Sequence, residues 1–384
     1  DGILNILDTH IAGDNDGDGV IDSTDDYPNN PARWLSCSSG SYGRFNCTDS
    51  IAGHYVPNTG SLLHTSQLEC SIGTYQPSTG QSSCIDASAG YYVDTTASIT
   101  QTACVAGTYN PNTASTSSSA CIDASAGYYV DTTGSTSQTA CSAGTYNPNT
   151  ASSSSSACTD ASAGYYVPST GSTTQIACAA GTYQPSTGQS SCTDSSAGYY
   201  VDTTASATQT ACEVGTYQPS TGQTSCIDAS AGYYVDTTAS TIQTACSVGT
   251  YNTNTGSTSS SACIDASAGY YVGSTGSASQ TPCAAGTYQP STGQSSCIDA
   301  SAGYYVSSTG SATQTACSTG TYQPSTGQSS CTDASVGYYV DTTASTTETA
   351  CALGTYQPST GQSSCIDASA GYYVGSTGSA SQTP

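Results

Sequence analysis

Residues 178–192 read C-A-A-G-T-Y-Q-P-S-T-G-Q-S-S-C, and residues 193–211 continue as T-D-S-S-A-G-Y-Y-V-D-T-T-A-S-A-T-Q-T-A. Cutting the chain before every odd-numbered cysteine yields ten variants of this unit, most of them 34 residues long and three of them 37. Self-similarity at a fixed period of this size is the signature of a tandem repeat array.

The repeat divides the chain into an N-terminal segment, a divergent first unit and nine regular units. The last unit ends in Ser381-Gln382-Thr383-Pro384, and the internal copy of these four residues is followed at once by Cys283. The natural chain is therefore expected to continue with a cysteine, and Asp1 is not expected to be its genetic start, because residues 1–10 do not resemble a signal peptide. The predicted boundaries are 1–36, 37–69, 70–103, 104–140, 141–177, 178–211, 212–245, 246–282, 283–316, 317–350 and 351–384.

Each unit consists of two related halves, which we call the first and second half-repeat. Gly181–Gly188 of a first half-repeat aligns with Gly164–Gly171 of a second one, and both read Gly-x-Tyr followed by a turn. Proline early in the turn presets φ, and the glycine after Ser-Thr can adopt the left-handed conformation that closes a hairpin with a bulge. Each half-repeat is therefore predicted to be a short β-hairpin with tyrosine on one face.

The predicted fold class is an all-β, disulfide-rich tandem repeat, with short hairpins stacked into an elongated rod or solenoid. The chain has one Trp, one Phe and no Met, but 30 Tyr, 40 Gly and 20 Cys. A globular domain of this length would need a large aliphatic core. The tyrosines are expected to form the core of each hairpin, since no other residues could form it.

Twenty cysteines at strict spacings indicate an oxidising compartment, and hence an extracellular or cell-surface location. Zinc binding would need closely spaced cysteine pairs or histidine partners, and the chain has only three histidines, all near its N-terminus. A closed loop of about 15 residues would stabilise each unit by about 3 kcal/mol in the chain-entropy model.

Two phases of disulfide pairing are open. The alternative phase, exemplified by Cys84–Cys104, leaves Cys37 without a partner and pairs Cys365 with a residue outside this sequence. The favoured phase pairs the two cysteines within each first half-repeat and uses all twenty: Cys37–Cys47, Cys70–Cys84, Cys104–Cys121, Cys141–Cys158, Cys178–Cys192, Cys212–Cys226, Cys246–Cys263, Cys283–Cys297, Cys317–Cys331 and Cys351–Cys365.

The pattern C-x-x-G-x-Y, with a cysteine some fourteen positions after the first, resembles the opening module of tumour-necrosis-factor-receptor and ephrin-receptor-like cysteine-rich repeats. The resemblance covers residues 37–384 and implies that the two cysteines of each module bridge, in agreement with the favoured phase. This chain differs from the family in having two cysteines per unit, and Ala161 stands where a matching cysteine would open a second half-repeat. It also lacks the charged ligand-facing loops of the receptors, so a receptor function is not implied.

Residues 14–25 read D-N-D-G-D-G-V-I-D-S-T-D, which matches a twelve-position calcium loop. The stretch resembles a thrombospondin type 3 repeat, and its final aspartate in place of glutamate favours a structural site over a switch. The alternative is a solvated acidic turn without metal. Each unit also carries one aspartate, such as Asp160, directly before its second half-repeat. An Asx-turn between hairpins is the favoured interpretation of this residue, and a periodic cation site is the alternative. The candidate calcium ligands are Asp14, Asp16, Asp18, Asp22 and Asp25 through side chains and Val20 through its carbonyl.

The net charge of −24 would repel phosphate backbones and anionic lipid, so nucleic-acid partners are not expected. No apolar run reaches the roughly 18 residues of a membrane span, and no catalytic signature occurs, so the chain is predicted not to be an enzyme. Asn46 lies in the one N-x-S/T sequon, and the Ser/Thr tracts and Ser-Thr-Gly turns are candidate O-glycan acceptors. Simple solvation of loops is the alternative.

The sequence favours a structural role for the chain, as part of an extracellular rod, stalk or filament that self-associates and carries covalent glycans. Nearly identical units without a specialised site are typical of such proteins. The alternative is an adhesin or receptor-like ectodomain that uses the array to present or bind ligands.

Overall fold

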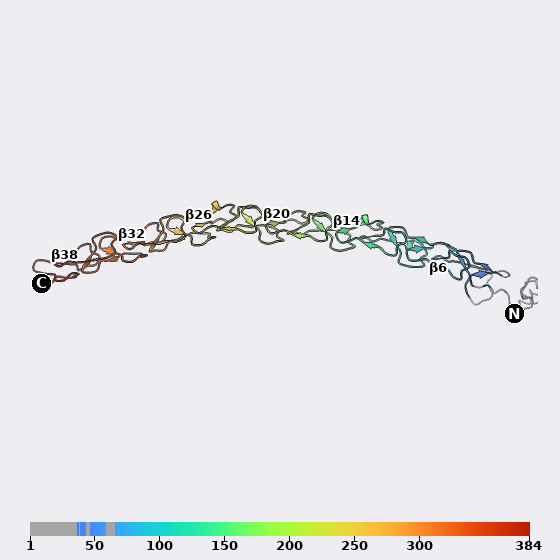
Figure 1. Cartoon of the computed structure of the whole chain (residues 1–384), viewed down its shortest axis with the longest axis horizontal. Coiled ribbons are helices and arrows are strands. Elements are labelled where there is room, and N and C mark those ends of the chain that lie inside the picture. The colour runs from blue at the N-terminus through green and yellow to red at the C-terminus, as the bar shows by residue number, and fades with distance from the viewer. Residues whose placement is uncertain (1–36, 38, 44–46, 59–65) are drawn as a thin grey trace, which may run out of the picture. The chain divides into compact units, whose positions relative to one another are not determined.

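The computed structural model describes residues 37, 39–43, 47–58 and 66–384. They form two compact units. The first holds the described residues up to Cys178 together with Gln184–Cys192 and Ala205–Ala207, and the second holds Ala179–Tyr183, Thr193–Thr204 and Thr208–Pro384. The described residues contain only two-residue strands and single 3₁₀ turns, and the strand pairs recur along the chain (Figure 1).

Each first half-repeat forms one antiparallel hairpin, which we call a disulfide hairpin. Its first strand is the Thr-Tyr pair that follows the recurring glycine of the repeat, as Thr182–Tyr183 follow Gly181. Its second strand begins directly after the second cysteine. The strand pairs are β1 (Ser41–Tyr42) with β2 (Thr48–Asp49), β5 (Thr74–Tyr75) with β6 (Ile85–Asp86), β9 (Thr108–Tyr109) with β10 (Ile122–Asp123), β13 (Thr145–Tyr146) with β14 (Thr159–Asp160), β17 (Thr182–Tyr183) with β18 (Thr193–Asp194), β21 (Thr216–Tyr217) with β22 (Ile227–Asp228), β25 (Thr250–Tyr251) with β26 (Ile264–Asp265), β29 (Thr287–Tyr288) with β30 (Ile298–Asp299), β33 (Thr321–Tyr322) with β34 (Thr332–Asp333) and β37 (Thr355–Tyr356) with β38 (Ile366–Asp367).

Each second half-repeat forms a tyrosine-pair hairpin, named after the Tyr-Tyr of its first strand. These strand pairs are β3 (His54–Tyr55) with β4 (Leu68–Glu69), β7 (Tyr91–Tyr92) with β8 (Thr102–Ala103), β11 (Tyr128–Tyr129) with β12 (Thr139–Ala140), β15 (Tyr165–Tyr166) with β16 (Ile176–Ala177), β19 (Tyr199–Tyr200) with β20 (Thr210–Ala211), β23 (Tyr233–Tyr234) with β24 (Thr244–Ala245), β27 (Tyr270–Tyr271) with β28 (Thr281–Pro282), β31 (Tyr304–Tyr305) with β32 (Thr315–Ala316) and β35 (Tyr338–Tyr339) with β36 (Thr349–Ala350). A single bridge between Tyr373 and Thr383 takes their place in the last half-repeat.

The three longer units accommodate their extra residues in the loop of the disulfide hairpin. There the chain forms one 3₁₀ turn just before the second cysteine, and the strands on either side keep their register. The turns are η2 (Ser118–Ala120), η3 (Ser155–Ala157) and η4 (Ser260–Ala262).

Neighbouring half-repeats are joined by a constant set of three backbone hydrogen bonds. The set recurs at equivalent positions from Gly53 to Gly378, with donor–acceptor distances of 2.7–3.1 Å. Because only backbone atoms take part, either kind of half-repeat can follow the other. Between β7–β8 and β9–β10 the bonds are Gly90 N–H to Asn110 C=O (2.8 Å), Val93 N–H to Ser115 C=O (2.9 Å) and Ala114 N–H to Ala87 C=O (2.7 Å).

The loop glycine takes the left-handed conformation that the sequence predicts, but its N–H does not close its own hairpin. Gly134 has a φ of +73°, and its N–H donates to the Cys104 carbonyl of the preceding half-repeat at 2.8 Å. A two-stranded hairpin alone is marginally stable in water. The loop glycine therefore contributes a hydrogen bond to the contact between half-repeats and not to its own hairpin.

The expectation that tyrosines form the core is wrong. The strand tyrosines are half-buried, whereas the residue after them is buried, as Val167 and Gln184 show. The opening residue of every described half-repeat before the last is also buried: Cys178 in a first half-repeat and Ala161 in a second are fully enclosed. These positions lie where one half-repeat meets the next, so small or flat side chains fill the core and each tyrosine ring covers it from outside.

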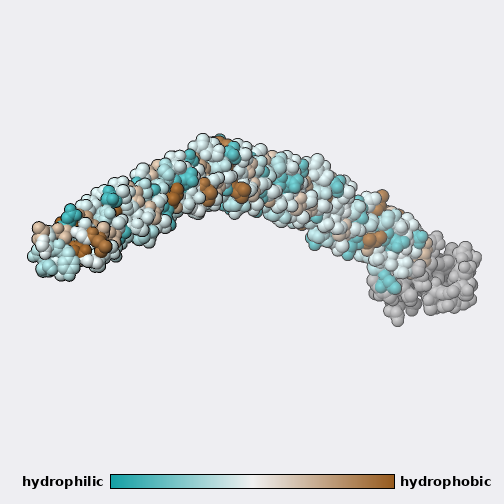
Figure 2. All heavy atoms as spheres, turned by 60° about the vertical axis from the view of Figure 1, so that its left-hand side comes forward, coloured by the Kyte–Doolittle hydropathy of each residue, from teal (hydrophilic) through white to brown (hydrophobic). Residues whose placement is uncertain are grey.

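The surface is mostly polar, with small separate patches of hydrophobic residues (Figure 2). Several of the exposed residues are isoleucines that precede the strand aspartate, including Ile85, Ile227 and Ile298, which are 44–48% exposed. Apolar side chains scattered singly are normal on protein surfaces.

Six loops hold alanine where the others hold glycine, and these alanines have φ of 52° to 58°. Replacing all six by glycine is expected to stabilise the fold by about 0.5–1 kcal/mol each, because the left-handed cost of alanine exceeds the extra chain entropy that glycine loses. Thermal unfolding followed by circular dichroism measures the gain. An unchanged or lower melting temperature would contradict the expectation. The residues are Ala97, Ala114, Ala151, Ala205, Ala239 and Ala344.

Candidate functional site

The structure joins all twenty cysteines in ten disulfides, and none of the described cysteines is free. Each bridge lies within one first half-repeat, the phase that parity favours, and connects Cα atoms 5.3–5.8 Å apart across a sequence separation of 10, 14 or 17 residues. The pairs are Cys37–Cys47, Cys70–Cys84, Cys104–Cys121, Cys141–Cys158, Cys178–Cys192, Cys212–Cys226, Cys246–Cys263, Cys283–Cys297, Cys317–Cys331 and Cys351–Cys365.

A glutamine replaces the disulfide in the second half-repeat. Gln175 stands 14 residues after Ala161, the same spacing as the bridged cysteines of the shorter units. Its Oε1 accepts a hydrogen bond from the Ser162 N–H at 2.7 Å. Equivalent bonds recur in the other regular second half-repeats, and Glu348 replaces glutamine in one of them, accepting from Ser335 N–H at 2.6 Å. Two kinds of staple therefore alternate along the chain.

A buried amide organises the loop of each regular disulfide hairpin. In the shorter units, Gln184 donates to the Ser191 carbonyl (2.9 Å) and accepts from the Ser186 N–H (3.1 Å). In the longer units the buried amide that organises the loop belongs to an asparagine, and Asn110 is completely buried. Buried amides cost free energy unless they are hydrogen-bonded. The residue after Thr-Tyr therefore determines the loop as well as the core.

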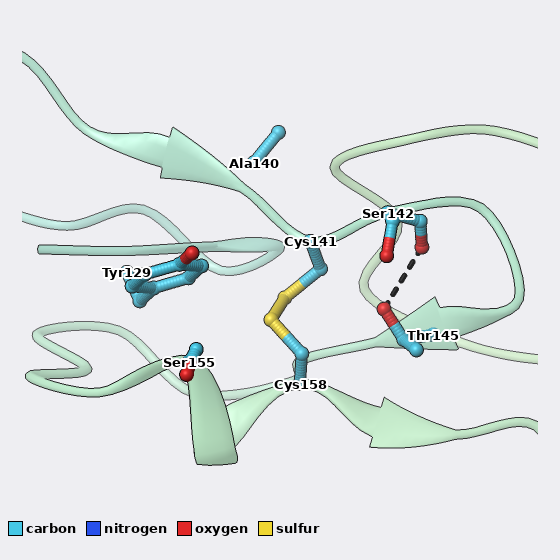
Figure 3. Close-up of a pocket in the computed structure, with 7 residues that line it drawn as sticks. All are labelled: Tyr129, Ala140, Cys141, Ser142, Thr145, Ser155 and Cys158. Carbon is cyan, nitrogen blue, oxygen red and sulfur yellow. Dashed lines mark hydrogen bonds between the residues drawn. A yellow bond between two sulfur atoms is a disulfide. The ribbon is translucent and has the colours of Figure 1, made fainter.

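A shallow hollow of about 330 Å³ lies beside the disulfide of the second long unit. Figure 3 shows the Tyr129 ring on one side of the Cys141–Cys158 bridge and Ser155 below the ring. Thr145, on the far side of the bridge, donates its hydroxyl to the Ser142 carbonyl at 2.8 Å. None of the residues that line the hollow carries a charged side chain.

The aspartate that recurs once per unit belongs to a strand, so the Asx-turn interpretation is wrong. Asp160 pairs with Thr145 across β13 and β14, and it is exposed. Each unit has one such aspartate, in the second strand of its disulfide hairpin, so the carboxylates are distributed along the chain one per unit. The described residues contain no group of three or more His, Cys, Asp or Glu side chains that could hold a metal ion.

The candidate calcium loop (Asp14, Asp16, Asp18, Val20, Asp22 and Asp25) and the candidate N-glycan acceptor Asn46 lie outside the described residues. The calcium site therefore stays a prediction. Terbium should bind in place of calcium and luminesce when Tyr27 or Trp34 is excited, because aromatic side chains close to a bound lanthanide transfer energy to it.

The luminescence should disappear with excess calcium or in the variant Asp14→Asn/Asp18→Asn, since a hard cation needs these carboxylates. The matched control is Asp160→Asn/Asp194→Asn, which removes the same charge from the array and should leave the signal intact. Equal signals from all three chains would contradict the site.

The sequence model of one family, described as tyrosine-protein kinase ephrin type A/B receptor-like, matches residues 198–246. The match covers the tyrosine-pair hairpins β19–β20 and β23–β24 and the disulfide hairpin between them. In that family the module is a non-catalytic extracellular domain. No curated protein sequence matches the chain.

The similarity to receptor-like cysteine-rich modules and the ten disulfides together indicate an extracellular or cell-surface location. Across the part of the chain that the structure describes, no helix is both long and apolar enough to cross a membrane.

Proposed function

We propose that the chain is a structural segment of an extracellular or cell-surface protein, a stalk or filament whose length is set by the number of half-repeats. One observation carries the proposal: every neighbouring pair of half-repeats from Gly53 onward uses the same three backbone hydrogen bonds. An interface that is identical at each step and needs no particular side chain supports growth in one dimension.

The contacts of each half-repeat are also local in the sequence. The backbone hydrogen bonds between half-repeats join each one to the next, and a glycine such as Gly73 packs against the loop two half-repeats later, at Ala114. Contacts between nearest neighbours are typical of repeat proteins, which are quasi-one-dimensional for that reason. The proposal includes calcium at the N-terminal loop, covalent glycans, self-association and the absence of catalysis.

Small-angle X-ray scattering on the chain and on variants that lack one, two or three whole units tests the proposal. Deletion of 283–316, for example, removes a unit that starts and ends in register. The maximum dimension should fall by a constant increment for each deleted unit. A dimension that falls only with the cube root of the mass would contradict the proposal, because it would mean that the units pack into a globule.

A receptor-like ectodomain is the second candidate, and the family match at residues 198–246 favours it. This function predicts that one unit binds a ligand more tightly than its neighbours do. Binding of single-unit deletion variants to an array of cell-surface glycans and proteins distinguishes the two functions. Loss of binding on removal of one particular unit would favour the receptor-like role.

A further inference from the structure

One threonine recurs at the same place in every regular hairpin loop that the structure describes. It stands directly before the loop residue with positive φ, from Thr79 before Gly80 to Thr377 before Gly378. The residue before it varies among Ser, Thr and Asn, and the one before that among Pro, Asp, Thr, Gly and Ser. First and second half-repeats, which differ in most other positions, share this threonine.

The fold does not use the side chain of this threonine. It is exposed in each regular loop, and Thr170 and Thr187 make no side-chain hydrogen bond with the described residues. Other hydroxyls close to them are engaged: Thr182 donates to the Ala179 carbonyl at 2.8 Å, and Ser172 to the Ser169 carbonyl at 2.8 Å. The loop threonine therefore makes none of the hydrogen bonds that these two neighbouring hydroxyls make.

Backbone stiffness alone does not account for the choice of residue. A β-branched side chain restricts the backbone before a turn, but valine and isoleucine do so equally well. Neither occurs at this position in any described half-repeat. What is kept is a branched carbon that carries a hydroxyl, which indicates a requirement from outside the fold.

The glycine loops of the second half-repeats lie beside a tyrosine, which suits a bound sugar. Gly171, which follows Thr170, lies so close to Tyr128 of the preceding second half-repeat that a Cβ atom on it would be 2.9 Å from the tyrosine hydroxyl. Tyr128 is half-buried, so part of this side chain is open to solvent. Sugars pack their C–H faces against aromatic rings, and this surface of the chain has little other apolar cover.

We propose that this loop threonine is the acceptor of an O-linked sugar, one for each half-repeat. The Oγ1 atom attacks the anomeric carbon of a sugar activated on a nucleotide or lipid phosphate. The new C–O bond forms as the sugar–phosphate bond breaks, the phosphate of the carrier leaves with the electron pair, and the hydroxyl proton passes to a base of the transferase. This assignment rests on the extracellular location in the proposed function, because secreted chains meet such transferases.

Peptide mass spectrometry of the chain secreted by its source cells tests the assignment. Cleavage before Asp160 and Asp194, after reduction, releases residues 160–193, which contain the free hydroxyls of Thr170 and Thr187 and the bonded one of Thr182. Electron-based fragmentation should place a sugar on Thr170 and Thr187 and none on Thr182. An unmodified peptide, or sugar confined to Thr182 or to the serine tracts, would overturn the assignment.

Valine substitutions provide the matched variants, since valine keeps the branched shape and removes only the hydroxyl. Thr187→Val should remove the mass of one glycan from the peptide, and T170V/T187V two, whereas Thr182→Val should leave the glycan mass unchanged. Unchanged glycan mass in T170V/T187V would overturn the assignment. The outcome is independent of the scattering test, because a chain without sugar can still lengthen by a constant increment per unit, and a glycosylated chain can fail to do so.

Discussion

Replacing Gly269 by alanine is expected to break the stack between two second half-repeats, whereas the same change at Gly273, four residues later, should be nearly neutral. Gly269 has a φ of +86°, and a Cβ atom there would run into the Gly310 carbonyl. Gly273 has no positive φ, and its Cβ would be 3.4 Å from the nearest atom, an ordinary contact. The expected cost at Gly269 is about 3 kcal/mol, from the left-handed penalty and the displaced neighbour together.

Hydrogen exchange measured by mass spectrometry is the appropriate readout, because it reports on the stability of individual half-repeats within the array. The N–H groups of Gly269 and Gly310 are hydrogen-bonded at 2.8 Å to neighbouring half-repeats. In Gly269→Ala their protection should fall by about 100-fold, the equivalent of about 3 kcal/mol. Equal protection in the two variants would show that the glycine contact does not hold the half-repeats together.

A second disulfide per unit should form when the second half-repeat is given the cysteines that it lacks. In Ala161→Cys/Gln175→Cys the new residues occupy the positions equivalent to Cys178 and Cys192, whose Cα atoms lie 5.8 Å apart. The loop entropy predicts a gain of about 3 kcal/mol. The lost hydrogen bond of Gln175 removes about 1 kcal/mol of it. The net gain is therefore expected to be about 2 kcal/mol.

The measurement is the number of free thiols in the oxidised double variant, followed by the melting temperature with and without reductant. No free thiol and a higher melting temperature are expected, with peptide mapping that places the new bridge between positions 161 and 175. The single variants are the controls, because each has one unpaired thiol and lacks the gain. Two free thiols, or exchange with Cys141 or Cys158, would show that the two half-repeats are not equivalent at these positions.

The local features of the fold could be predicted from the sequence because they depend on residues a few positions apart. The Gly-Thr-Tyr and Gly-Tyr-Tyr strands, the left-handed loop residue and the pairing of Cys178 with Cys192 all belong to this class. The hydrogen bond of Gln175 was not predicted, because a glutamine does not by itself indicate a link between two parts of the chain. The one indication in the sequence was its spacing from Ala161, which equals that of the bridged cysteines.

Which residues are buried could not be predicted in the same way, because burial depends on how one half-repeat meets the next. Val167 and Gln184 occupy the same position in the two kinds of half-repeat, and both are buried, although one is apolar and the other polar. Composition favoured the tyrosines, which are by far the most numerous aromatic residues in the chain. The period of a repeat gives the length of each step and not the face on which successive steps touch.

The disulfides also determine how the chain would respond to a pulling force. A bridge such as Cys178–Cys192 keeps the loop between its two cysteines, a sequence separation of 14 residues, from extending. When a 34-residue unit gives way under tension, only about 20 residues can extend, which corresponds to about 70 Å of fully extended chain. The covalent path through the sulfur atoms bears the load, so the chain would absorb a sudden pull in short steps and shorten again when the load is removed.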